Sequence, residues 1–294
     1  MIELINISKQ YSSLKAVDDL SLVVQPGRIC GFLGPNGAGK TTTIRMLMNI
    51  IHPDEGSIQF DGSPERPAAE QFGYLPEERG LYQKISVEET LRYFAHLRNV
   101  SDANDKILAL LEQFDLHERL NSKVSELSKG NQQKLQFINT ILHDPEYIIL
   151  DEPFSGLDPV NQLVLKQILD EKKAAGKTII FSSHQMDQVE KICDDVVMIH
   201  KGSSVLAGDL KTIKRRHGQT QLQVIPESPA DLEHPIFSDL EADIRDDAAY
   251  LSLDGNKKQD LISRINQVLA VQSIKVDEPG LEEIFIQLVQ GERT

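Results

Sequence analysis

A short glycine-rich segment carries the residue types that bind phosphate groups. Residues 34–41 are Gly-Pro-Asn-Gly-Ala-Gly-Lys-Thr, a full match to the phosphate-binding loop pattern G-x-x-x-x-G-K-[ST]. Glycines let successive backbone N–H groups turn inward and approach an anionic oxygen, which a Cβ would obstruct. In this pattern Lys40 reaches the β- and γ-phosphates, and the Thr41 hydroxyl takes one position on Mg²⁺. The segment therefore predicts a site for a phosphate chain and a metal ion.

The pattern has this meaning only between a strand and a helix. Residues 28–33 are a short apolar strand candidate, and residues 42–50 have the composition of a helix whose N-terminus points at the phosphates. We therefore predict that the chain binds a nucleoside triphosphate. The loop alone leaves kinases, GTPases and motor proteins open.

Two adjacent carboxylates follow another apolar strand. Residues 147–150 are Tyr-Ile-Ile-Leu, and Asp151 and Glu152 come directly after them. Because side chains alternate across a strand, we expect the two carboxylates to point in different directions and to have different roles. Beside a phosphate-binding loop, an aspartate in this place helps to hold Mg²⁺. The neighbouring glutamate can orient an attacking water or accept its proton.

Length and composition limit the classes of protein to consider. At 294 residues the chain has room for two domains, and its 40% hydrophobic and 26% charged residues are ordinary for a soluble globular protein. The net charge of −14 argues against a nucleic-acid partner held by phosphate contacts. Cys30 and Cys193 have neither metal-ligand nor disulfide spacing. We expect a cytoplasmic protein, because the N-terminus does not resemble a signal peptide and no stretch approaches the roughly 18 apolar residues of a membrane span.

Periodicity predicts the elements that position these residues. Residues 1–60 look mainly β apart from the helix after the loop, and residues 86–144 have helical periodicity. Strands and helices then alternate, with strands expected at 147–150, 177–182 and 195–200 and helices at 160–175 and 186–193. Such alternation indicates an α/β fold with a mostly parallel sheet that helices cover on both faces.

The last part of the chain has a different texture. From about residue 207 the motifs stop, and a basic stretch at 211–216 follows. Beyond it we expect a small α+β extension, with strands at 219–225, 250–253 and 273–276 and helices at 259–270 and 281–289.

Taken in order, the motifs resemble those of the ATP-binding subunits of ABC transporters. Residues 127–133, Leu-Ser-Lys-Gly-Asn-Gln-Gln, stand where that family carries Leu-Ser-Gly-Gly-Gln. Residues 155–158 match its dimer-contact loop, and His184 ends a strand as its switch histidine does. The likeness covers residues 2 to about 205. Five ordered motifs make it far more specific than the phosphate-binding loop alone.

The resemblance implies the P-loop NTPase fold of the ABC ATPases. Its ATP-binding domain would occupy residues 1–206, with a β-rich N-terminal part and a helical subdomain inserted at about 83–140. The small C-terminal domain would occupy residues 207–294 and is similar to the extension of many bacterial exporter ATPases.

The resemblance also implies a role for each site residue. Tyr11 would stack on adenine, Glu152 would polarise the attacking water, and His184 would contact the γ-phosphate and sense its loss. Lys40 would act both in binding and in catalysis. The ligands of Mg²⁺ would be Thr41, Glu77 and Asp151. The phosphates of ATP would be held by Gly34, Pro35, Asn36, Gly37, Ala38, Gly39, Lys40, Thr41 and Thr42.

In this family a second subunit completes the ATP site. Residues 127–133 are expected at a helix N-terminus, which offers free N–H groups and a partial positive charge to an anion. The residues implied to contact the second subunit's nucleotide are Ser128, Gly130, Asn131 and Asp158. The implied partners are therefore a second copy or a paralogous ATPase, and a separate transmembrane permease that holds the chain at the inner face of the membrane. The permease would contact residues 83–140 and the 74–82 loop.

Two departures from the family pattern bear on activity. Glu77 stands where the family usually has glutamine, which adds a negative charge near the phosphates and puts the hydrolysis rate and the Mg²⁺ affinity in doubt. Lys129 and Asn131 replace a glycine and a glutamine, and Lys129 either attracts the γ-phosphate or projects into solvent. Both variants resemble a bacterial subgroup described as sodium- or drug-efflux type.

The resulting prediction is the ATP-hydrolysing subunit of a bacterial ABC transporter, with export as the favoured direction. Two alternatives stay open at this stage. One is a soluble ABC protein acting on ribosomes or nucleic acid, which the single motif set and the acidic balance disfavour. The other is a module that senses ATP without hydrolysing it, which Glu77 keeps open. The cargo is not predicted, because the permease selects it.

Overall fold

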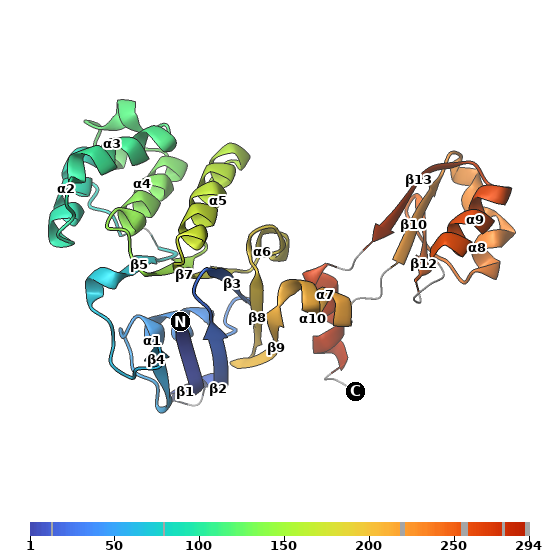
Figure 1. Ribbon diagram of the computed structural model, residues 1–294, viewed down its shortest axis with the longest axis horizontal. Coiled ribbons are helices and arrows are strands. Elements are labelled where there is room, and N and C mark those ends of the chain that lie inside the picture. Colours follow the sequence, from blue (N-terminus) through green and yellow to red (C-terminus); the bar gives the residue numbers. More distant parts are fainter. Residues whose placement is uncertain (13, 79, 218–220, 254–257, 278–279, 292–294) are drawn as a thin grey trace. The chain divides into compact units, whose positions relative to one another are not determined.

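The computed structural model describes residues 1–12, 14–78, 80–217, 221–253, 258–277 and 280–291. The chain divides into two compact units, Met1–Asp209 and Leu210–Thr294 (Figure 1). The division falls three residues beyond the boundary that we expect from the sequence. Within the described ranges, no helix is both long enough and apolar enough to cross a membrane.

A six-stranded sheet forms the centre of the first unit. Its strands follow the order β5-β6-β7-β3-β8-β9, and all pair in parallel except β9, which is antiparallel to β8. Their bounds are β3 Arg28–Leu33, β5 Phe72–Leu75, β6 Tyr147–Asp151, β7 Thr178–Ser183, β8 Asp195–His200 and β9 Ser203–Asp209. The expected parallel sheet is therefore present. The short β5 and the antiparallel β9 were not predicted.

A second, antiparallel sheet supplies the β-rich N-terminal part. Its order is β2-β1-β4, with β1 at Ile2–Tyr11, β2 at Leu14–Val24 and β4 at Glu55–Phe60. Helix α1, Lys40–Leu47, contributes Ile44 and Leu47 to an apolar core that it shares with both sheets. This packing fixes α1, and so the loop before it, against two layers at once.

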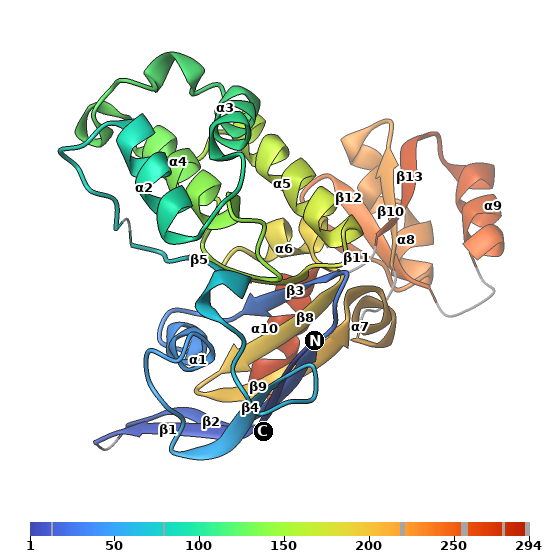
Figure 2. The same cartoon turned by 60° about the vertical axis from the view of Figure 1, so that its left-hand side comes forward.

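The helical segment between β5 and β6 forms a cluster of its own beside the sheet (Figures 1 and 2). Its helices are α2 Val87–Leu97, α3 Ala103–Gln113 and α4 Lys129–Ile141. Ser86 starts α2 with a capping box, because its hydroxyl accepts from Glu89 N–H while the Glu89 carboxylate accepts from Ser86 N–H. These helices lie within the inserted segment expected at about 83–140. Two further helices, α5 Pro159–Ala174 and α6 Met186–Ile192, connect the last parallel strands.

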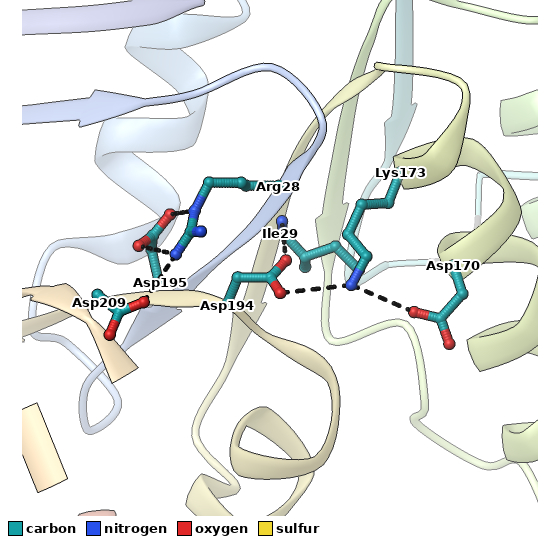
Figure 3. A network of polar contacts seen from close by, with 7 residues as sticks. All are labelled: Arg28, Ile29, Asp170, Lys173, Asp194, Asp195 and Asp209. Atoms are coloured by element: carbon teal, nitrogen blue, oxygen red, sulfur yellow. Dashed lines mark hydrogen bonds and ion pairs between the residues drawn. The ribbon is translucent and has the colours of Figure 1, made fainter. Parts of the chain in front are cut away.

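Ion pairs hold the first residue of β3 to the neighbouring strands (Figure 3). The Arg28 guanidinium donates to both carboxylate oxygens of Asp195 at 2.5 and 2.6 Å, and to Asp209 at 3.0 Å. These bonds, with Asp195 first, raise the pKa of Arg28. Beside them Lys173, near the end of α5, lies 3.3 Å from Asp194, which also accepts the N–H of the second residue of β3. The strand that leads into the phosphate-binding loop is thus anchored at its start.

The second unit has the β-α-β-β-α-β order of a split βαβ motif. Its antiparallel sheet has the order β11-β12-β10-β13. The elements are β10 Gln221–Pro226, α8 Pro235–Asp239, β11 Asp243–Arg245, β12 Ala248–Ser252, α9 Lys258–Val268 and β13 Val271–Asp277. Its apolar core includes Leu222, Val224, Phe237 and Ile265. Helices α7, Leu210–His217, and α10, Leu281–Gly291, contact each other.

Candidate functional site

The glycine-rich loop joins the end of β3 to the start of α1. Gly39 is the N-cap of α1 with φ 110°, and a Cβ there would lie 2.4 Å from the Ala16 carbonyl oxygen. Gly37 has φ 79° with open space beside it. Both conformations favour glycine, and the second also keeps the approach to the loop clear. The loop leads into the first turn of α1, whose N–H groups have no hydrogen-bond partner within the helix.

Lys40, the first residue of α1, folds back over the loop. Its Nζ donates to the Gly34 carbonyl oxygen at 2.5 Å and to that of Pro35 at 3.3 Å, and the side chain is buried. Burial lowers the pKa of Lys40, an effect that nearby carboxylates, Glu152 foremost, oppose. The ammonium is therefore held at the loop rather than extended into solvent.

Beside the loop lies a cleft of about 250 Å³. It gathers side chains from β1, β2, the loop, the segment after β5 and the end of β6. The lining residues are Tyr11, Leu14, Ala16, Asn36, Gly37, Gly39, Lys40, Thr41, Thr42, Glu77, Asp151 and Glu152. Sequence reasoning missed Leu14 and Ala16. Leu14 pairs with Tyr11 between β1 and β2, and its side chain is 66% exposed. The expected loop residues that do not line the cleft are Gly34, Pro35 and Ala38.

The chemistry of the cleft fits a hard divalent cation. Asp151 is 2% exposed, and its Oδ2 has no hydrogen-bond partner in the described part of the chain. Burial, followed by the charges of Glu77 and Glu152, raises the pKa of Asp151 to about 6. With the Thr41 hydroxyl, the cleft offers the oxygen ligands that Mg²⁺ prefers.

Among the described residues, no group of three acidic, histidine or cysteine side chains is placed to hold a metal unaided. Such a group of three is not needed at Mg²⁺ sites that are built from one or two carboxylates plus the phosphates of a substrate. The residues present therefore fit a cation that enters together with a phosphate chain.

Glu152 follows β6 with φ 50°, a left-handed conformation that is uncommon for a side chain other than glycine or asparagine. Its Oε1 accepts from the His184 N–H at 2.8 Å and lies 2.6 Å from His184 Nδ1, and its Oε2 accepts from the Ser183 hydroxyl at 3.1 Å. We expected strand alternation to separate Glu152 from Asp151. That reason is wrong, because β6 ends at Asp151 and the left-handed turn sets the direction of Glu152.

The remaining predicted ligands lie at two other helix starts. Ser128 is the N-cap of α4, and its hydroxyl accepts from Asn131 N–H at 3.2 Å. Asp158 is the N-cap of α5. The two helix starts are neighbours, because a Cβ on Gly130 would lie 2.9 Å from the Gly156 carbonyl oxygen. None of these residues lines the cleft. The structure thus separates the predicted ligands into two groups.

Comparison with known proteins identifies the class to which this fold and site belong. The chain matches the ABC transporter family model over residues 17–155 and the model of the DrrA1-3-like ATP-binding protein C-terminal domain over residues 208–289. It is 39% identical over 293 residues to the ABC transporter ATP-binding protein YhaQ of Bacillus subtilis (strain 168), covering 98% of each chain. The chain therefore belongs to the ABC transporter ATP-binding proteins.

More distant relatives belong to the same class of protein. The ABC transporter ATP-binding protein NatA of Bacillus subtilis (strain 168) is 35% identical over 236 residues, which cover 76% of this chain and 96% of NatA. The Nod factor export ATP-binding protein I of Burkholderia pseudomallei (strain K96243) is 37% identical over 213 residues, which cover 70% of each chain. The protein is thus the ATP-binding subunit of an ABC transporter, of the bacterial subgroup with a C-terminal extension.

Solved structures confirm the predicted fold of the first unit. The structure of an ATP-binding subunit of an ABC transporter superposes with a TM-score of 0.69 at 34% identity, covering 74% of this chain and 92% of that one. An ATP-binding cassette in its ADP conformation superposes with a TM-score of 0.63 at 23% identity, covering 72% of this chain and 92% of that one, a likeness of fold alone.

Proposed function

We propose that this subunit hydrolyses ATP with Mg²⁺ and drives a separate transmembrane permease in export. The observation that carries the proposal is the cleft, in which the phosphate-binding loop faces Asp151 and Glu152. Hydrogen bonds from His184 and Ser183 hold the Glu152 carboxylate there. A module that only senses ATP needs no glutamate held in this way beside the loop.

In the proposed reaction the chain positions ATP and stabilises charge. The Tyr11 ring, 44% exposed at the end of β1, stacks on the base. The loop N–H groups and Lys40 bind the phosphate oxygens. Thr41, Glu77 and Asp151 would hold Mg²⁺, which when bound neutralises charge on the phosphates. Glu152 orients the attacking water, and His184, already paired with Glu152, contacts the γ-phosphate.

A second copy or a paralogous ATPase completes the proposed site. Ser128, Gly130, Asn131 and Asp158 lie outside their own cleft, at the N-termini of α4 and α5. These ends present N–H groups and a partial positive charge. Such a group suits the γ-phosphate bound in the cleft of a partner, with two ATP molecules enclosed head to tail. Binding of ATP would then close the dimer, and hydrolysis would loosen it.

The proposed permease contact lies on the helical segment. A cavity of about 380 Å³ between β5, α2, α4 and the residues that follow α1 is lined by, among others, Phe94, Arg66 and Arg98. Nearby on the same segment, Tyr82 and Tyr93 are each at least half exposed and pack edge to face at 6.2 Å. Exposed aromatic rings beside a basic cavity suit a protein partner. The names of NatA and the Nod factor export protein support a role of this chain in a bacterial transporter. The second name also supports export as the direction of transport.

The test is the Glu152→Gln variant of the full chain, compared with the wild type in steady-state ATPase, ATP-binding and gel-filtration measurements with Mg²⁺. We expect turnover to be lost while ATP binding is kept and the dimer persists. The matched control is Glu118→Gln, at an exposed position on the helical segment, which should leave all three unchanged. Unchanged turnover in Glu152→Gln would refute the role of Glu152. A wild type that binds ATP but never hydrolyses it would favour the sensing module.

A further inference from the structure

Helix α4 connects its phosphate-facing N-terminus to both acidic loops of its own cleft. Two glutamines one turn apart, Gln133 and Gln136, are 2% and 5% exposed. Residues three apart on a helix share one face, so both amides can reach the same side. That side meets the segment after β6, through Gln133 and Pro153, and the segment after β5, through Gln136 and Glu78.

Gln133 contacts the segment that presents Glu152. Its Nε2 donates to the Pro153 carbonyl oxygen at 3.1 Å in a buried hydrogen bond. Pro153 directly follows Glu152, whose φ of 50° costs free energy unless its surroundings hold it. The Gln133 amide is therefore one of the groups that hold the turn on which the direction of Glu152 depends.

Gln136 contacts the segment that presents Glu77. Its Nε2 lies 3.3 Å from the Glu78 carbonyl oxygen and 3.5 Å from that of Pro76, on either side of Glu77. Its Oε1 is buried and has no hydrogen-bond partner in the described ranges. A buried amide oxygen without a partner costs free energy, so the hydrogen bonds of Nε2 are what hold this amide in place. The Gln136 amide therefore ties the loop that carries Glu77 to α4.

We propose that Gln133 and Gln136 are positioning residues that couple the two ATP sites of the dimer. The inference rests on the proposed function, in which the N-terminus of α4 binds the nucleotide of the partner. When that nucleotide draws α4 toward it, the buried amides shift the turns that carry Glu152 and Glu77 in the subunit's own cleft. Each subunit thus senses the partner's ATP through one helix, and the coupling is a difference in contacts between two arrangements.

The experiment measures steady-state ATPase of the full chain as a function of ATP and of Mg²⁺. The variants are Gln133→Leu and Gln136→Leu, with Gln133→Asn and Gln136→Asn as a second pair that keeps the amide but shortens its reach. Gln167→Leu controls for the substitution, because Gln167 is an exposed α5 glutamine whose Nε2 donates to Glu171 on the same helix at 3.2 Å. Thermal unfolding of each variant reports its folded fraction.

We expect Gln133→Leu to lower kcat about 10- to 100-fold with KM for ATP unchanged, and Gln136→Leu to raise the half-saturating Mg²⁺ concentration about tenfold. Both should lower the Hill coefficient for ATP from above one toward one, and the asparagine variants should follow them. Variants whose kcat, Mg²⁺ dependence and Hill coefficient match the wild type would overturn the inference. So would losses that only follow the folded fraction, or a wild type that hydrolyses ATP without cooperativity. A wild type without ATPase activity would instead refute the proposed function.

Discussion

The buried carboxylate of Asp151 should reduce the stability of the chain while serving its site. Asp151 is 2% exposed at the end of β6, and burial, with Glu77 and Glu152, raises its pKa from 3.8 to about 6. Between these two pH values the folded chain binds more protons than the unfolded chain. The stability from this group is therefore present below about pH 4 and is lost as the pH rises through 6. At pH 7 the loss amounts to at most about 3 kcal/mol.

Asp151→Asn keeps the size of the side chain and removes the charge. We expect the free energy of unfolding at pH 7 to rise by about 1–3 kcal/mol, because the neutral amide avoids the cost of burying a carboxylate. The melting temperature of a chain of this length should rise by about 2–5 °C. At pH 5, where the wild-type carboxyl is largely protonated, the gain should fall to about half. ATP hydrolysis with Mg²⁺ should be lost, since Asp151 is a proposed metal ligand.

Differential scanning calorimetry of the full chain at pH 7 and pH 5, with EDTA and without nucleotide, measures this gain. Glu118→Gln removes one charge at an exposed position and so controls for the net charge of −14. An Asp151→Asn variant that is no more stable than the wild type at pH 7 would refute the reasoning. A gain that does not shrink at pH 5 would refute its electrostatic origin.

Two further substitutions test the loop and its anchor. Gly39→Ala should abolish ATP binding, measured by equilibrium dialysis, because its Cβ would meet the Ala16 carbonyl at 2.4 Å. Gly62→Ala, at φ 76° with open space, is the matched control and should keep binding. Arg28→Met should lower the free energy of unfolding by about 1 kcal/mol in urea titrations, and 1 M NaCl should shrink that difference. Equal losses at low and high salt would show that Arg28 acts through packing rather than through Asp195.

Local signals were strong enough to predict most of the first unit. The loop was evident because its glycines adopt backbone conformations that other residues rarely adopt, as the φ of 110° at Gly39 shows. Helical periodicity predicted α2 and α3. Short continuous apolar runs predicted β6 to β8, because strands buried on both faces are apolar throughout. The four-residue β5 was missed because so short a strand carries little periodicity of its own. The seven-residue β9 was missed because it is an edge strand without a fully buried residue, so it lacks the continuous apolar run of the central strands.

The sequence by itself determined the family, the nucleotide and the order of the motifs, because these depend on residue types at fixed local spacing. Only the tertiary structure decided which motifs meet. It brings Tyr11, at the end of β1, and Glu77, in the segment after β5, to the loop, and it adds Leu14 to the cleft, because sheet order rather than chain order sets these neighbours. The left-handed turn at Glu152 and the buried contacts of Gln133 also depend on packing between distant segments, which no local pattern encodes.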